Sequence, residues 1–249
     1  MAIQFNCVLS MLILVLLSIS SVEGQGGGGD GVIDVVAKFG AKADEKTDLT
    51  TLDGPCKAPI EIQVEGTVKA PADPGAFKDP KWIAFNRIEN FKLSGGGLFD
   101  GQGTTAYKRE VSATDESPNT DGIQIGRSDG VNVLNLEIKT GYDCVSIGDG
   151  SKNLVINGVT CGPRHGINIG SLGLFKNEEP VDGVTIKNCT LTNTSNGVRI
   201  KTWPGTEPGT CSNIHFQDIT VTNVSSPIII YQKYCPWNKC KIMKNQKLN

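Results

Sequence analysis

The sequence repeats short pairs of apolar residues at alternate positions, and this repeat limits the folds that the chain can adopt. From residue 120 onward the pairs are separated by Gly, Asn, Asp and Ser, which is the pattern of β-strands and not of helices. One series recurs at intervals of 23 to 30 residues: Val131/Val133, Leu154/Ile156, Val184/Ile186 and Ile214/Phe216. A second series recurs at intervals of 22 to 31 residues: Ile123/Ile125, Val145/Ile147, Ile167/Ile169, Val198/Ile200 and Ile228/Ile230.

Two interleaved strand series with one repeat length predict a chain that returns to the same face on every turn. The predicted fold class is therefore all-β, a single-stranded parallel β-helix, or solenoid. Asn132, Asn153 and Asn213 lie beside or within the apolar pairs, where stacked turns favour a ladder of side-chain amides. The alternative all-β fold is an antiparallel sandwich, which needs hairpin turns and does not explain the repeat.

The N-terminal segment differs in composition from the rest. An apolar run of about a dozen residues ends near Ile19, the length of a signal-peptide core, and Val22 and Gly24 suit a cleavage site before Gln25. We therefore predict a signal peptide at 1–24, a glycine-rich leader at 25–31, and a parallel β-helix domain at 32–249. An uncleaved membrane anchor is the alternative, but the run is shorter than a membrane span.

Other features agree with a secreted protein. Three Asn-x-Ser/Thr sequons predict N-glycosylation at Asn188, Asn193 and Asn223. Removal of residues 1–24 also removes Cys7 and leaves seven cysteines, which fit an oxidising compartment. The 24 Lys and Arg against 26 Asp and Glu argue against a nucleic-acid partner. We expect no membrane partner after signal cleavage, and a monomer.

Polar residues that can carry chemistry stand next to the second series of strands. Asp121, Asp143 and His165 each precede an apolar pair by two residues, and Arg199 and Lys201 flank the last residue of a fourth pair. Each of these residues alone has a structural explanation, because Asp favours turns and exposed strands carry solvated cations. If the coils stack in register, however, the five side chains converge on one surface, which predicts a functional site.

These motifs resemble those of a known family. The segments Asn119-Thr-Asp121, Asp143-Cys144, His165-Gly166 and Arg199-Ile-Lys201 resemble the signature motifs of the polygalacturonases, glycoside hydrolase family 28. The segments 54–60, 64–71 and 94–103 are similar to plant exopolygalacturonases of the pollen type. The resemblance implies a right-handed β-helix in the plant cell wall that hydrolyses pectin or polygalacturonate with inversion, without a cofactor or metal.

The resemblance also implies roles for individual residues. Asp121 and Asp143 match the pair that activates water, and His165 matches the active-site histidine. Substrate binding is implied for Asn119, Arg199 and Lys201. The chain departs from the family at Tyr142, which stands where the general-acid aspartate is expected, because a phenol is a weak proton donor. Arg164 also stands where the family has glycine.

The family pattern implies further expectations about cysteines and chain length. Cys144 and Cys161 match a disulfide of the family. Apart from the resemblance, we predict a pair Cys235–Cys240 that closes a small loop and a pair Cys189–Cys211, which leaves Cys56 unpaired. Compared with the family, the chain is shortened between residues 48 and 54, between residues 103 and 117, and beyond Cys240.

Three functions remain open at this point. The first is a secreted, exo-acting polygalacturonase with a substituted proton donor at Tyr142. The second is a pectin-binding relative without activity. The third is a pectate lyase on the same fold, which would need a calcium site and a basic proton abstractor that the acidic motifs do not supply.

Overall fold

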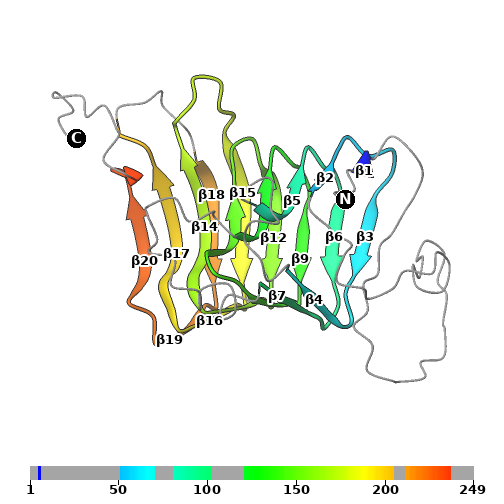
Figure 1. Ribbon diagram of the computed structural model, residues 1–249. Coiled ribbons are helices and arrows are strands. Elements are labelled where there is room, and N and C mark those ends of the chain that lie inside the picture. The colour runs from blue at the N-terminus through cyan, green and yellow to red at the C-terminus, as the bar shows by residue number, and fades with distance from the viewer. Residues whose placement is uncertain (1–4, 7–50, 71–80, 102–120, 205–210, 237–249) are drawn as a thin grey trace.

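The structure, a computed structural model, describes residues 5–6, 51–70, 81–101, 121–204 and 211–236. Within these segments no α-helix occurs, and all pairings between strands are parallel. Figure 1 shows the strands stacked along one axis in chain order, from the cyan end to the red end. The predicted parallel β-helix is confirmed.

Three sheets form the walls of the solenoid. The first has eight strands: β1 (Phe5–Asn6), β2 (Thr51–Asp53), β5 (Lys81–Asn86), β8 (Asp121–Gly126), β11 (Asp143–Ile147), β14 (Arg164–Leu172), β17 (Thr194–Thr202) and β20 (Ser226–Tyr231). The second has six: β3 (Ile60–Gln63), β6 (Phe91–Ser94), β9 (Asn132–Leu134), β12 (Lys152–Asn157), β15 (Val181–Lys187) and β18 (Cys211–Gln217). The third has six: β4 (Thr67–Lys69), β7 (Leu98–Asp100), β10 (Glu137–Lys139), β13 (Thr160–Cys161), β16 (Thr190–Thr192) and β19 (Thr220–Thr222).

The two predicted strand series are the first and second sheets. In the first sheet the apolar pairs align residue for residue from β8 to β20, and Ile125, Ile147, Ile169, Ile200 and Ile230 form one column. The second sheet stacks Leu154 on Val184 and Ile156 on Ile186 in the same way. These columns fill the interior, where most of the aliphatic side chains have no exposed surface. Burial of these columns is the main stabilising contribution.

The amide ladders involve different residues from those predicted. Asn153 and Asn213 donate hydrogen bonds to carboxylates of the preceding coil, those of Asp129 and Asp182, at 2.8 Å. Asn132 donates to a backbone carbonyl two residues away, so the predicted ladder of Asn132, Asn153 and Asn213 is wrong. True amide pairs form instead between Asn188 and Asn157, and between Asn223 and Asn193, at 2.8 Å. The difference is one of position, because Asn157 is the last residue of β12, whereas Asn188, Asn193 and Asn223 each follow a strand directly and have positive φ angles.

The last described coil leaves interior positions uncovered. Ile228 and Ile230 on β20 are 73% and 71% exposed, whereas Val198, which aligns with Ile228 on β17, is 3% exposed. The same column of side chains is therefore a packed core in the middle of the solenoid and an apolar surface at this end. This contrast provides a direct test of what stacking contributes.

We expect Ile147→Ala to lower the free energy of unfolding by about 2–5 kcal/mol, because it leaves a cavity in the stacked column. Ile230→Ala removes the same atoms from an exposed position of that column, so it should change stability by less than about 0.5 kcal/mol. Urea unfolding followed by circular dichroism would compare the two variants. Equal losses would show that stacking does not govern stability in this chain.

The cysteines confirm one predicted disulfide and correct two other expectations. Cys144 and Cys161 are bonded, with Cα atoms 5.8 Å apart. Cys189 and Cys211 are free thiols. Cys211 begins β18 whereas Cys189 follows β15, its parallel partner, so the two lie at opposite ends of a strand pair about 20 Å long, beyond the reach of a disulfide.

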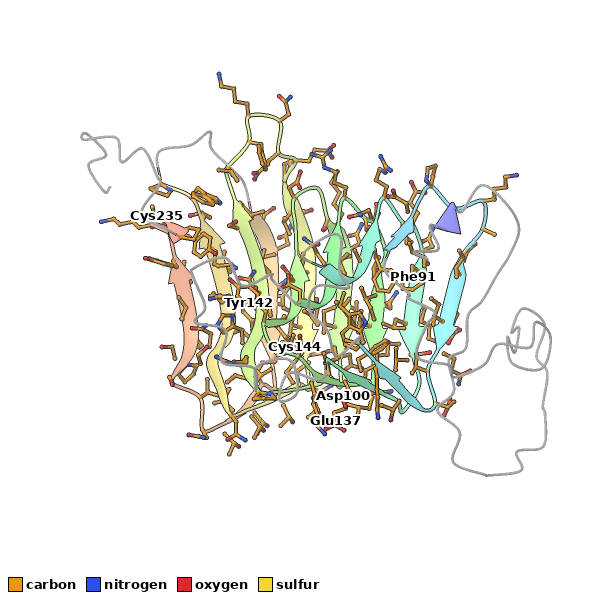
Figure 2. The ribbon with its side chains drawn as sticks, in the orientation of Figure 1. Phe91, Asp100, Glu137, Tyr142, Cys144 and Cys235 are labelled. Atoms are coloured by element: carbon orange, nitrogen blue, oxygen red, sulfur yellow. A yellow bond between two sulfur atoms is a disulfide. The ribbon has the colours of Figure 1, made fainter. Side chains whose placement is uncertain are left out.

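Cys56 was expected to be unpaired, and this expectation is wrong because Cys56 is disulfide-bonded. The expectation followed from an assignment in which Cys189 pairs with Cys211, and these two residues are free thiols. Cys235 is also disulfide-bonded and lies beyond β20 at the end of the solenoid (Figure 2). Cys240 lies outside the described residues, so the pair Cys235–Cys240 stays a prediction.

The N-terminal predictions lie largely outside the described residues. The structure places β1 beside β2, but the rest of the predicted signal peptide at 1–24 and the leader at 25–31 are not described. No helix in the described part of the chain is long and apolar enough to cross a membrane. The three predicted glycosylation sites, Asn188, Asn193 and Asn223, are all exposed.

Candidate active site

The predicted functional residues meet on the eight-stranded sheet. Asp121 and Asp143 begin β8 and β11, and His165 lies at the start of β14 directly opposite Asp143. Arg199 and Lys201 come from β17, one coil further along. Four successive coils thus each contribute one or two side chains to one site. Asn119 lies outside the described residues.

Asp143 is the centre of this cluster. Its Oδ1 accepts a hydrogen bond from Arg199 Nη2 at 2.7 Å, and its Oδ2 accepts one from Lys201 Nζ at 3.3 Å. His165 Nδ1 lies 3.2 Å from Oδ1, an ion-pair distance without good hydrogen-bond alignment. Burial acts to raise the pKa of Asp143, but the contacts with His165, Lys201 and Arg199 outweigh burial and lower the pKa. Asp143 is therefore a carboxylate under ordinary conditions.

The two cations are themselves buried. The side chains of Arg199 and Lys201 are 11% and 5% exposed, and burial lowers the pKa of Lys201. Charges in such a position need a close counter-charge, which Asp143 provides to both. The cation pair and Asp143 therefore form one unit, in which each member depends on the others.

Asp121 has the opposite electrostatic character to Asp143. It is 7% exposed, and its Oδ1 makes no hydrogen bond within the described segments. Burial and the nearby negative charge of Asp143 raise the pKa of Asp121 to about 7, against the opposing effects of Lys201 and Ser146. Two neighbouring carboxyl groups thus differ in protonation, which is a common arrangement in acid–base catalysis.

This shift predicts how Asp121 affects stability as the pH changes. The folded chain holds a proton on Asp121 that the unfolded chain releases near pH 3.8, so Asp121 lowers stability as the pH rises from about 4 to about 7. We expect Asp121→Asn to be more stable than the parent chain at pH 8. We also expect its free energy of unfolding to fall less than that of the parent between about pH 4 and about pH 7. Urea unfolding at several pH values would test the expectation, and parallel curves for the two proteins would contradict it.

Tyr142 lies beside the two carboxyl groups, at the position where the resemblance implies a general acid. Its ring packs against His165 with centroids 4.7 Å apart, and its hydroxyl hydrogen-bonds to that of Tyr234. Burial, with Tyr234 and Asp143 acting in the same direction, raises the pKa of Tyr142 above its ordinary value. Figure 2 shows Tyr142 close to Cys144, whose disulfide to Cys161 links this coil to the next.

Two polar residues of the site were missed by the sequence analysis. Asn168 is 1% exposed, accepts a hydrogen bond from Arg199 Nε at 3.3 Å, and donates one to the carbonyl of Gly170 at 2.6 Å. Ser146, which aligns with Asn168 on the neighbouring strand, hydrogen-bonds to Asp121. Both residues stand between the two members of an apolar pair, and this repeated polar position was a signal that could have identified them.

Tyr234 was also missed, and no local pattern could have identified it. It follows β20, yet its backbone N–H donates to the Thr202 carbonyl at 3.0 Å and its ring lies 4.8 Å from Lys201 Nζ. Trp203 packs edge-on against the same ring. Within the described residues, no group of three or more His, Cys, Asp or Glu side chains could hold a metal ion.

The sequence matches a known family over most of its length. The profile of "Glycosyl hydrolases family 28" matches residues 32–111 and 105–247. The chain is 47% identical over 331 positions to a "Polygalacturonase" from Gossypium hirsutum, covering all of this chain and 80% of that protein. Because 331 exceeds 249 by 82, at least 82 of these positions are gaps in this chain.

A second relative and one solved structure complete the comparison. An "Exopolygalacturonase" from Oenothera organensis is 46% identical over 252 positions, covering 80% of this chain and 70% of that protein. The fold is similar to that of an endo-xylogalacturonan hydrolase from Aspergillus tubingensis, with a TM-score of 0.58, 21% identity, and coverage of 80% of this chain and 49% of that one. The profile match and the identity to plant relatives show that this chain belongs to glycosyl hydrolases family 28.

Proposed function

We propose that this chain acts on the α-1,4-galacturonosyl linkages of pectin and hydrolyses them with inversion, as an exo-acting polygalacturonase. The observation that carries the proposal is the pair of carboxyl groups of unequal pKa, Asp121 and Asp143, beside the buried cations Arg199 and Lys201. A polyanionic sugar chain needs cations near the cleaved bond, and hydrolysis needs a carboxylate that accepts a proton from water. The plant relatives named polygalacturonase and exopolygalacturonase point to the same substrate.

In the proposed mechanism, Asp143 is the base that removes a proton from the attacking water. Its contacts with Arg199, Lys201 and His165 keep it ionised, so it can accept that proton. Asp121 lies on the preceding coil, where its buried Oδ1 would hold the same water in line with the anomeric carbon. Arg199, Lys201 and Asn119 would bind the galacturonate carboxylates.

Protonation of the departing glycosidic oxygen is the step that this mechanism supports least well. Tyr142 occupies the position of the expected acid, and its raised pKa makes it a poorer donor than an ordinary phenol. This observation favours a second candidate function, in which the chain binds pectin without cleaving it.

Release of reducing ends from polygalacturonate by the full chain, beside an Asp121→Asn variant, separates the two candidates. Release that is lost in the variant would support the hydrolase, and galacturonate monomer as the main product would support exo attack. Binding to polygalacturonate without release would support the pectin-binding candidate. Neither binding nor release would contradict both.

We also propose that the chain is secreted to the plant cell wall as a monomer. The predicted signal peptide at 1–24 and the exposed sequon residues Asn188, Asn193 and Asn223 support this destination. N-terminal sequencing of the secreted protein should begin at Gln25. Retention of residues 1–24 would contradict the signal peptide.

A further inference from the structure

Two tyrosines from distant parts of the chain meet at the candidate active site. Tyr142 directly precedes β11, and Tyr234 follows the end of β20. In the eight-stranded sheet, β14 and β17 lie between these two strands (Figure 1). The hydroxyl of Tyr142 donates a hydrogen bond to the hydroxyl of Tyr234. The pair, which we call the tyrosine bridge, therefore joins the two sides of the region that carries the other site residues.

Each end of the tyrosine bridge rests on a side chain of the site. The ring of Tyr142 packs against the imidazole of His165, with centroids 4.7 Å apart. The ring of Tyr234 lies over Lys201, with Nζ 4.8 Å from the ring centroid, which is a favourable cation–aromatic distance. The bridge is thus held at both ends and lies over residues that the proposed function requires.

The side chains at the bridge have little contact with solvent. Asp143 and Lys201 are 2% and 5% exposed, and Arg199 and His165 are 11% and 24% exposed. A ligand carboxylate pairs with an ammonium or a guanidinium only when its oxygen comes within about 3 Å. The Nζ atom of Lys201 has the Tyr234 ring on one side and Asp143 on another, so a ligand carboxylate has no open approach to it.

We propose that the tyrosine bridge is a gate, whose hydrogen bond holds the site closed and must break before an anionic ligand reaches Arg199 and Lys201. A closed state lowers the apparent affinity for a ligand in proportion to the fraction of open molecules. A single hydrogen bond between neutral groups changes such an equilibrium by about two- to tenfold. The proposal rests on the proposed function only for the identity of the ligand, a galacturonate chain.

The accessibility of Lys201 tests the gate without any ligand. The folded, full chain is treated with N-hydroxysulfosuccinimidyl acetate, and mass spectrometry follows acetylation of Lys201 relative to the exposed Lys176 of the same molecule. We expect Tyr142→Phe to raise the relative rate at Lys201 about two- to tenfold. This variant removes the hydroxyl of the bridge and keeps the ring that packs against His165.

A matched control removes a different tyrosine hydroxyl from the same cluster. The ring of Tyr231 packs edge-on against Tyr234, with centroids 6.2 Å apart, and its hydroxyl makes no hydrogen bond among the residues that the structure describes. Tyr231→Phe should therefore leave the acetylation of Lys201 unchanged. The rate in Tyr142→Phe should also be independent of urea below the unfolding transition. A steep rise with urea would assign the reaction to unfolded molecules and would overturn the gate.

Calorimetric titration with pentagalacturonate gives a second measurement. Tyr142→Phe should bind this ligand about two- to tenfold more tightly than the parent chain, and Tyr231→Phe should equal the parent. The turnover number at saturating substrate should not rise in Tyr142→Phe, because loss of the hydroxyl supplies no proton donor. A gate therefore changes binding and leaves the chemical step as it was.

The outcomes separate the gate from the proposed function. An unchanged rate of Lys201 acetylation in Tyr142→Phe would overturn the gate, whatever the ligand binding. Faster acetylation with unchanged affinity for pentagalacturonate would also overturn it, because the bridge would then not control access of the ligand. Faster acetylation in a chain that binds no pentagalacturonate would support the gate and contradict the proposed function.

Discussion

Substitution of Asp143 by Asn is expected to lower the free energy of unfolding by about 3–5 kcal/mol and to abolish any hydrolysis. The loss arises because Arg199 and Lys201 are almost fully buried and depend on Asp143 for a counter-charge. An amide of the same shape cannot compensate two positive charges in that position. Urea unfolding at pH 7 would measure the effect on stability, and reducing-end release would measure the effect on activity.

Two further variants identify the cause of the Asp143 effect. Asp182→Asn changes a half-buried aspartate whose carboxylate accepts hydrogen bonds from Ser212 and Asn213, and it should cost far less stability than Asp143→Asn. Adding Lys201→Met to Asp143→Asn removes one of the uncompensated charges and should recover part of the lost stability. An Asp143→Asn variant as stable as its parent would show that the buried cations do not need this carboxylate.

Substitution of Tyr142 by Asp is expected to raise the rate of polygalacturonate hydrolysis by about 100- to 10,000-fold. This is the usual contribution of general acid catalysis, and Tyr142 stands where the resemblance to the polygalacturonases implies the acid. The tyrosine hydroxyl bonds to Tyr234, and its raised pKa makes proton donation unfavourable. The turnover number from reducing-end release, measured across pH, would test the expectation, because a new carboxylic acid adds a decline at high pH.

The controls for Tyr142→Asp distinguish the effect of a new proton donor from the effect of the volume that the smaller side chain opens. Tyr142→Asn opens the same volume without a proton donor, so it should remain as slow as the parent chain. Tyr142→Phe keeps the ring against His165 and removes only the hydroxyl, and it should also change little. If Asp and Asn give equal rates at this position, the missing acid is not what limits the reaction.

The sequence was sufficient to predict two of the three sheets. Alternating pairs such as Val145/Ile147 show the strand period directly, and their spacing gave the register that the structure has. The third sheet was not predicted because its strands have two or three residues. Each of its strands contributes one inward side chain, such as Phe99 or Ile138, and a single apolar residue cannot show the alternating pattern of a strand.

The site could be predicted where its residues share a register with the apolar pairs. Asp143, His165, Arg199 and Lys201 fall at regular offsets from these pairs, and the structure brings them into contact. Tyr234 could not be predicted, because it reaches Lys201 from a segment after β20 that follows no repeat. The pairing of Cys189 with Cys211 failed for a related reason, since sequence spacing does not show at which end of a strand a residue lies.

The uncovered end of the solenoid has a consequence for how function responds to heat. Among the coils that the structure describes, the coil of β18, β19 and β20 pairs with a neighbour on one side only, so its local opening costs less free energy than opening of an interior coil. Arg199 and Lys201 lie on β17, directly beneath this coil, and Tyr234 follows it. Fraying that begins at this end would therefore reach the cation pair before it reaches most of the core, so we expect warming to disrupt the site while the remaining coils are still folded.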